Sequence, residues 1–197
     1  MVLTRGWLLR IVELGFLPTD SAELRLKKVA LSLVPLIIGP FALAWGLIYV
    51  WLGYAVSGAI PILYFFISAL SLLYFFRTKR TGFIQNSQLI LVLCLPFFLM
   101  WSLGGFAGSG MVMMWAIFSP IAALMFLSRR AAFVWFMLYF LFILVSVLID
   151  AKVATLATSL PDVAQRSFYL LTIGFASAGL YLLVSFSMNE EKRATAS

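Results

Sequence analysis

Six long runs of apolar residues, separated by short polar or glycine-rich breaks, occupy the chain between Val29 and Phe186. About twenty consecutive apolar residues are enough for a helix to cross a bilayer. The runs predict spanning helices over residues 29–49, 57–76, 83–101, 111–127, 131–149 and 168–187. We therefore expect an all-α fold, an integral membrane bundle of six transmembrane helices.

Two polar segments flank this predicted bundle, which we assign to residues 20–188. In residues 1–19, apolar positions such as Trp7 and Val12 alternate with charged ones, the pattern of an interfacial amphipathic helix; a frayed tail is the alternative. Asp20 and Glu23 have capping-box spacing, so we expect a helix to begin near Ser21 with Asp20 as its N-cap. Residues 189–197 are polar, and they either continue the last predicted span as a helix into the cytoplasm or form a C-terminal tail.

The basic residues are distributed very unevenly between the breaks. Lys and Arg number 14 against 7 Asp and Glu, and twelve of the 14 lie on one side of the predicted bundle. The positive-inside rule then places both termini in the cytoplasm. Eight of these residues are expected at lipid headgroups: Arg25, Lys27, Lys28, Arg77, Lys79, Arg80, Arg129 and Arg130. Nucleic acid is not expected as a partner, because no soluble basic surface is predicted.

Composition excludes several kinds of chemistry. Hydrophobic residues make up 64% of the chain and charged residues only 11%. Cys94 is the single cysteine and there is no histidine, so no disulfide within the chain, no thiolate metal site and no histidine-ligated haem is expected. We predict no catalytic residue, no cofactor and no metal site. No cleavable signal peptide is expected either, because Arg10 and Glu13 interrupt the first apolar run.

The break between the third and fourth runs differs from the others, because four of its ten residues, 101–110, are glycine. Glycine permits positive φ and close backbone approach, and a loop that dips between helices can use both. The segment predicts an outward pocket for a small hydrophobic or amphiphilic ligand, lined by Trp101, Gly104, Gly105, Phe106, Ser109, Met114, Trp115 and Pro120. A tight outer turn with aromatic anchors is the alternative.

Three further patterns concern helix packing. Gly174 and Ala178 have small-xxx-small spacing, which favours close approach of a second helix and a homodimer. Gln85, Asn86 and Gln88 open the third run and are interpreted as interhelical hydrogen-bonding residues. The alternative is that they lie near the cytoplasmic interface, where polar groups cost little. The turn after the fourth run is so short that its neighbours must be antiparallel. The longest link is expected at residues 150–167.

The order of these features resembles the N-terminal six-helix membrane domain of bacterial class III adenylate and guanylate cyclases. The resemblance covers roughly residues 15–193. It is carried by Leu17, Pro18 and Asp20, the basic cluster before the first span, the glycine loop with Gly104, Gly105, Phe106, Ser109 and Gly110, then Trp115, Pro120, Arg129 and Arg130, and the polar tail at residues 189–193. Similar membrane modules also precede sensor kinases.

The resemblance implies a membrane anchor, sensor and dimer scaffold in cyclic nucleotide (cAMP or cGMP) signalling, located in a bacterial inner (plasma) membrane. It also implies that residues 189–197 are the start of a cytoplasmic transducer helix. The metal-binding aspartates of those cyclases belong to a cytoplasmic domain, and none of them has a counterpart in this chain. Two other functions stay open. A small accessory or scaffold subunit, bound to partner membrane subunits, would suit the 19 phenylalanines. The second of these is a transporter or channel, although such proteins usually carry ionisable residues inside their spans.

Overall fold

The computed structural model describes residues 7–156 and 161–196, and every regular element in those residues is helical. Their bounds are α1 (Trp7–Glu13), α2 (Ala22–Trp51), α3 (Ala55–Thr78), α4 (Thr81–Ser102), α5 (Gly105–Gly108), the 3₁₀ helix η1 (Val112–Ile117), α6 (Phe118–Phe126), α7 (Arg129–Leu156) and α8 (Asp162–Ala196). Among them, α2, α3, α4 and α7 are long and apolar enough to cross a membrane. The all-α class and the presence of membrane-spanning helices are confirmed.

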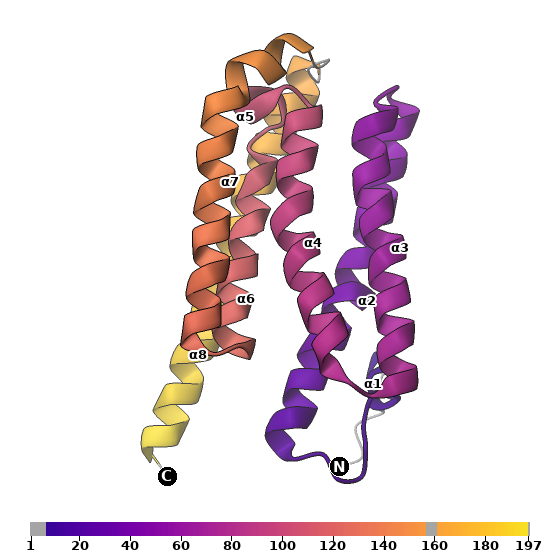
Figure 1. Cartoon of the computed structure of the whole chain (residues 1–197), viewed down its shortest axis with the longest axis vertical. Coiled ribbons are helices and arrows are strands. Elements are labelled where there is room, and N and C mark those ends of the chain that lie inside the picture. The colour runs from indigo at the N-terminus through magenta and orange to yellow at the C-terminus, as the bar shows by residue number, and fades with distance from the viewer. Residues whose placement is uncertain (1–6, 157–160, 197) are drawn as a thin grey trace.

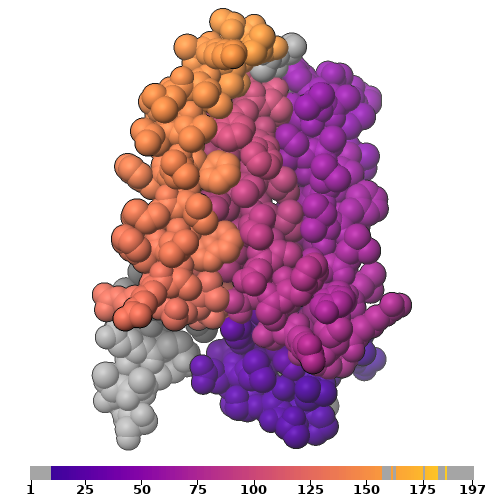
Figure 2. All heavy atoms as spheres, in the orientation of Figure 1, coloured from indigo at the N-terminus to yellow at the C-terminus, as the bar shows by residue number. Residues whose placement is uncertain are grey.

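The long helices lie side by side along one axis (Figure 1). α2 and α3 pack together on one side, α4 lies in the middle, and α6, α7 and α8 lie on the other side. Both ends of the chain lie at one end of the bundle, whereas α5 and the end of α7 lie at the opposite end. In the space-filling view α7 forms one flank, α2 and α3 form the other, and α4 lies between them (Figure 2).

α4 is the central helix of the bundle. Half of the residues in its most apolar stretch are buried, against 11% in that of α7. Leu93, Phe97 and Met100 of α4 are almost inaccessible. The Phe97 ring centroid lies 5.1 Å from that of Phe142 and 6.0 Å from that of Tyr139, both on α7. Because lipid tails are as apolar as these side chains, close packing rather than hydrophobic burial stabilises such contacts in a membrane.

Two glycines set the distance between α2 and α3. A Cβ added to Gly46 would lie 2.7 Å from the Gly58 carbonyl oxygen, and one added to Gly58 would lie 2.6 Å from the Gly46 carbonyl oxygen. Real Cβ atoms essentially never come this close to backbone, so the two helices can cross here only because neither residue has a side chain. This crossing was not predicted from the sequence.

Polar side chains join α3 to α4 inside the apolar bundle. The Tyr64 hydroxyl donates to Gln88 Oε1 at 3.2 Å, and Gln88 Nε2 donates to Ser68 Oγ at 3.1 Å. Ser102 Oγ donates to Ser57 Oγ at 2.9 Å nearer the other end of the pair. The interhelical role predicted for Gln88 is confirmed, since hydrogen bonds between helices are the expected use of an amide at membrane depth.

The link predicted at residues 150–167 is wrong in extent. α7 continues through Asp150 and Lys152 to Leu156, and α8 begins at Asp162; residues 157–160 lie outside the described residues. The polar residues Asp150 and Lys152 do not end the helix, because no glycine or proline lies between Asp150 and Leu156. Pro161 directly precedes α8, and a proline disfavours helical conformation in the residue before it.

The fourth predicted helix, residues 111–127, divides into η1 and the nine-residue α6. Gly110 and Met111, with φ values of +65° and +61°, lie outside right-handed helix geometry and fix where the segment begins. Pro120 lacks an N–H and is tolerated in the first turn of α6, where it lies. The tight turn that follows does bring α6 and α7 together as antiparallel neighbours.

The N-cap prediction is also corrected. Ser21, not Asp20, caps α2, and its hydroxyl accepts a hydrogen bond from Leu24 N at 3.2 Å. Asp20 is instead engaged by Lys28, eight residues along the chain. The predicted interfacial helix is short: α1 covers Trp7–Glu13, and residues 1–6 lie outside the described residues. Val12, which was expected against the membrane, is only 1% exposed.

Candidate functional site

The glycine-rich segment closes the end of the bundle opposite to the chain termini (Figure 1). Its backbone uses the left-handed region repeatedly, with φ of +91° at Gly104 and +83° at Gly105. Residues other than glycine rarely adopt such φ values. The sequence between α4 and η1 therefore forms a compact turn around α5, and the glycines are required by its backbone geometry.

Trp101 is anchored to α7 by both its ring and its nitrogen. Its indole stacks on Phe142 with ring centroids 6.0 Å apart and an interplanar angle of 19°. Its Nε1 donates to Ser146 Oγ at 2.9 Å, and Ser146 in turn donates to the Phe142 carbonyl at 2.7 Å. A tryptophan N–H usually finds a partner when the ring is half-buried, so this contact fixes the end of α4 against α7.

Asp150 of α7 holds the glycine segment in place. Its Oδ1 accepts a hydrogen bond from the Phe106 backbone N–H at 2.9 Å. A Cβ added to Gly105 would overlap the same oxygen. Sequence reasoning assigned Asp150 to a link and missed this role. The available signal was that Asp150 is the one carboxylate adjoining the fifth apolar run.

The other residues of the predicted pocket lie in or beside this turn. Ser109 is 1% exposed, and its hydroxyl donates to the Phe106 carbonyl at 3.4 Å. Trp115 packs at a tilt on Phe118 with ring centroids 5.9 Å apart. Met114 is half-buried in η1 and Pro120 is buried in α6. The glycine turn and Trp101 form a packed cap on the bundle, whereas Met114, Trp115 and Pro120 lie further along the chain in η1 and α6. A ligand pocket among these residues stays a prediction.

Gly174 and Ala178 lie on a face of α8 that this chain leaves uncovered. Both are exposed, and a Cβ added to Gly174 would meet no atom within 4 Å. Gly179, by contrast, faces the bundle, since its added Cβ would lie 3.0 Å from the Phe118 ring. The small-residue pair therefore takes no part in packing within the chain, and its role in a dimer stays a prediction.

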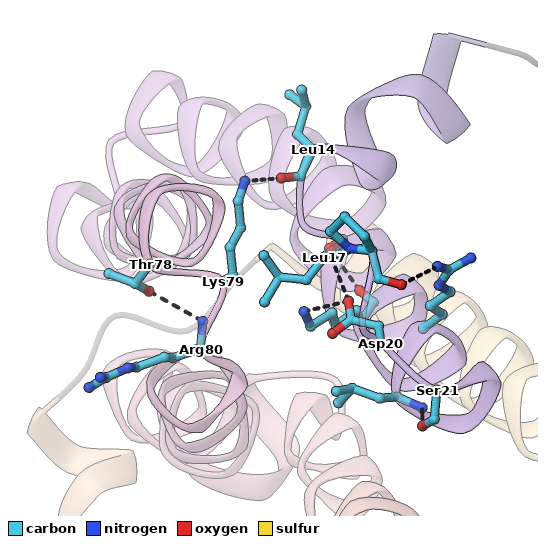
Figure 3. Close-up of polar contacts among 12 residues, drawn as sticks. Leu14, Leu17, Asp20, Ser21, Thr78, Lys79 and Arg80 are labelled. Atoms are coloured by element: carbon cyan, nitrogen blue, oxygen red, sulfur yellow. Dashed lines mark hydrogen bonds and ion pairs between the residues drawn. The ribbon is translucent and has the colours of Figure 1, made fainter.

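Four of the eight basic residues predicted at lipid headgroups make side-chain contacts within the protein: the three lysines and Arg25, whose guanidinium lies over the Phe16 ring. Lys28 is 1% exposed and its Nζ lies 2.8 Å from Asp20 Oδ2. Lys27 Nζ donates to the Phe126 carbonyl at 3.1 Å. Lys79 Nζ donates to the Leu14 carbonyl (Figure 3) and to the Phe76 carbonyl.

The contacts of Lys27 and Lys79 follow from the electrostatics of helix C-termini. The last four carbonyls of a helix lack intrahelical partners and carry partial negative charge. Lys27 reaches the end of α6, and Lys79 joins the end of α3 to the turn after α1. The five arginines among the eight are exposed at the same end of the bundle: Arg25, Arg77, Arg80, Arg129 and Arg130.

Asp20 is held by two donors at this end of the bundle. Besides Lys28, the Leu17 backbone N–H donates to its Oδ2 at 2.7 Å (Figure 3). The hydrogen bond from the Lys28 ammonium, followed by that from Leu17, holds the pKa of the Asp20 carboxyl below its ordinary value of 3.8. Hydrogen bonds to the ionised form favour it. Asp20 thus ties the N-terminal segment to α2.

This geometry predicts a pH dependence of stability. A carboxyl whose pKa is lowered by folding stabilises the fold above pH 3.8, and that contribution is lost as the pH falls below 3.8. Asp20→Asn is expected to lower the thermal unfolding midpoint at neutral pH, and the gap to the wild type should close below pH 3.8. Circular dichroism of both purified proteins over a series of pH values measures this difference between their unfolding midpoints. Glu23→Gln is the control, and a gap that does not change with pH contradicts the assignment.

Comparisons with models of protein families, with curated proteins and with solved structures find no match for this chain.

Proposed function

We propose that this chain is a six-span membrane anchor and sensor domain that dimerises and passes a signal along α8. The observation that carries the proposal is the position of α8. It is 35 residues long, packs against η1 and, through Phe168, against Trp45 and Tyr49 of α2, and extends past the ends of α6 and α7 (Figure 1). A helix that continues past its neighbours can pass on a shift or rotation when a ligand favours one of two arrangements.

The path of the chain supports the number of crossings. α2, α3, α4, the segment from η1 through α6, α7 and α8 run alternately up and down the bundle, so an even number of passes returns the chain to its starting end. Twelve of the 14 basic residues belong to that end in the sequence. The positive-inside rule favours a cytoplasmic location for it. In the proposed function, the end of α8 is the cytoplasmic output.

The class of output domain rests on the sequence resemblance alone. The arrangement of glycine loop, basic turn and polar tail resembles the membrane domain of class III nucleotide cyclases, so we propose that α8 controls the dimeric state of such a domain. Catalysis would then reside outside residues 1–197, and the chain itself would be non-catalytic.

Cross-linking at Ala178 tests the dimer. The only cysteine, Cys94, is replaced by Ala, and Ala178→Cys is then introduced and oxidised in native membranes. We expect a disulfide-linked homodimer, because close helix approach at small residues brings equivalent positions together. Leu141→Cys, half-exposed on α7, is the matched control and should stay monomeric.

Two results would contradict the proposal. An Ala178→Cys chain that remains monomeric after the same oxidising treatment would exclude this face as the dimer contact. A cross-link to a different protein in stoichiometric amount would favour the accessory-subunit function. Mass spectrometry of the cross-linked band distinguishes the two.

A further inference from the structure

α5 is hydrogen-bonded to α7 on one side and to α8 on the other. The Phe106 backbone N–H donates to Asp150 Oδ1 of α7 at 2.9 Å. The carbonyl of the next residue, Ala107, accepts hydrogen bonds from two side chains of α8, the Gln165 amide and the Tyr169 hydroxyl, the latter at 3.2 Å. Two long helices therefore meet on adjacent residues of α5.

α5 is a single turn of four residues, Gly105–Gly108, and does not fix its own position. Isolated helices shorter than about 12 residues are marginal in water. A helix leaves unpaired N–H groups at its start and unpaired carbonyls at its end. Here the start meets a carboxylate of α7 and the end meets two donors of α8. The position of α5 is therefore set by the helices that bind its two ends.

The backbone that follows α5 also lies directly against α8. A Cβ added to Gly110 would lie 2.8 Å from Phe168 Cβ and 3.1 Å from the Tyr169 backbone nitrogen. Real Cβ atoms essentially never come within 3.0 Å of another atom, so a side chain does not fit between them. The Phe168 ring reaches on to α2, with its centroid 4.9 Å from that of Trp45 and 5.6 Å from that of Tyr49. The start of α8 cannot keep its place if Gly110 shifts toward it.

The bonds between α5 and α8 lie at the surface, at the end of the bundle opposite to the chain termini (Figure 1). Ala107 is exposed, and Phe106 and Asp150 are half-buried beside it. Segments with solvent-exposed backbone hydrogen bonds open more readily than the core. A molecule that binds at this end of the bundle can therefore alter these bonds without unfolding the long helices.

We propose that α5 and the glycines around it, residues 104–110, are a coupling element that sets the position of α8 relative to α7. Asp150 positions α5, and Gln165 and Tyr169 transfer that position to α8. Two sites are coupled when both bias one shared element. The coupling is a property of the fold, whereas its use in signalling rests on the proposed function. In that function, a change at α5 shifts the start of α8 and with it the face that carries Gly174.

Hydrogen–deuterium exchange of the full chain in detergent, read by mass spectrometry, tests the coupling. Asp150→Ala removes the acceptor on α7. We expect the amides in the first turns of α8 to exchange about tenfold faster, the factor for loss of one hydrogen bond to a charged group. Lys152→Ala, an exposed residue of α7, is the control and should leave α8 unchanged. Asp150→Asn keeps the shape of the side chain and a weaker acceptor, so it should give the same change at smaller size.

Tyr169→Phe together with Gln165→Leu removes the α8 side of the link. In that background the start of α8 already exchanges faster, and Asp150→Ala should add less than about twofold, because effects that act through one shared contact are not additive. Tyr181→Phe, an exposed tyrosine of α8, is the matched control for Tyr169→Phe. It should leave the full effect of Asp150→Ala in place.

Three results would overturn the coupling element. Unchanged exchange of α8 in Asp150→Ala would show that the two helices are not coupled. An equal rise with and without the α8 side chains would show that the effect does not pass through α5. An equal rise in α3 would show a general loss of stability. Cross-linking at Ala178 reports separately: coupled exchange in a monomeric chain contradicts only the proposed dimer, and a dimer without coupled exchange contradicts only the coupling element.

Discussion

Gly58→Val is expected to remove most of the folded protein from the membrane. The first atom of the new side chain would lie 2.6 Å from the Gly46 carbonyl oxygen and 3.0 Å from the Val50 backbone nitrogen. Backbone cannot move aside as a flexible side chain can, so α2 and α3 would have to separate along their length. Overpacking usually costs about 1–3 kcal/mol and occasionally more. We expect the upper end of that range or beyond here.

Folded yield after detergent extraction and the thermal unfolding midpoint measure this effect. Gly82→Val is the matched control, because Gly82 also lies in a helix and its added Cβ would meet no atom within 4 Å. Gly46→Val should be as damaging as Gly58→Val, since the same crossing is blocked from the other helix. Equal stability of Gly58→Val and Gly82→Val would show that the two helices do not cross at these glycines.

Gly105→Ala is the second substitution with a large expected effect. The residue has φ of +83°, a region that costs about 1–2 kcal/mol for a residue with a Cβ. The added methyl would also overlap Asp150 Oδ1, the oxygen that accepts the Phe106 hydrogen bond. Both effects act together, so the loss of stability should exceed the backbone strain alone.

Gly53→Ala separates these two contributions. Gly53 has φ of +91°, but its added Cβ would meet nothing within 4 Å, so only backbone strain of about 1–2 kcal/mol is expected. Denaturation of both variants in the same detergent gives the difference directly. In the Asp150→Ala background the steric part of the Gly105 effect should disappear. A Gly105→Ala chain no less stable than Gly53→Ala would rule out the contact with Asp150.

The length of the apolar runs was sufficient to predict α2, α3, α4 and α7, whereas the fourth run divides into η1 and α6. Hydrophobic length is a local property, since a run of about twenty apolar residues forms a helix in lipid whatever its neighbours are. The predicted ranges 57–76 and 83–101 lie within α3 and α4, each a few residues short of the ends. The role of Gln88 was likewise predictable, because an amide at membrane depth needs a hydrogen-bonding partner.

Only the tertiary structure decided which small residues pack against each other and which polar groups form hydrogen bonds. Gly174 and Ala178 have the spacing that favours close packing, yet Gly46 and Gly58 make the close crossing within the chain. The sequence contains small residues in several helices, and which of them face each other depends on crossing positions that no local pattern records. Asp150 likewise meets Phe106 only because α7 rises beside α5.

The same distinction applies to the charged end of the bundle. Sequence alone determined that basic residues cluster on one side of the spans, because their positions between apolar runs are visible in one dimension. Which of them make contacts within the protein was decided by the tertiary structure. Lys28 turns inward to Asp20, and Lys27 and Lys79 bind helix ends that come from distant parts of the chain. An ion pair or a capped carbonyl needs two groups within about 3 Å, and only the folded chain brings them that close.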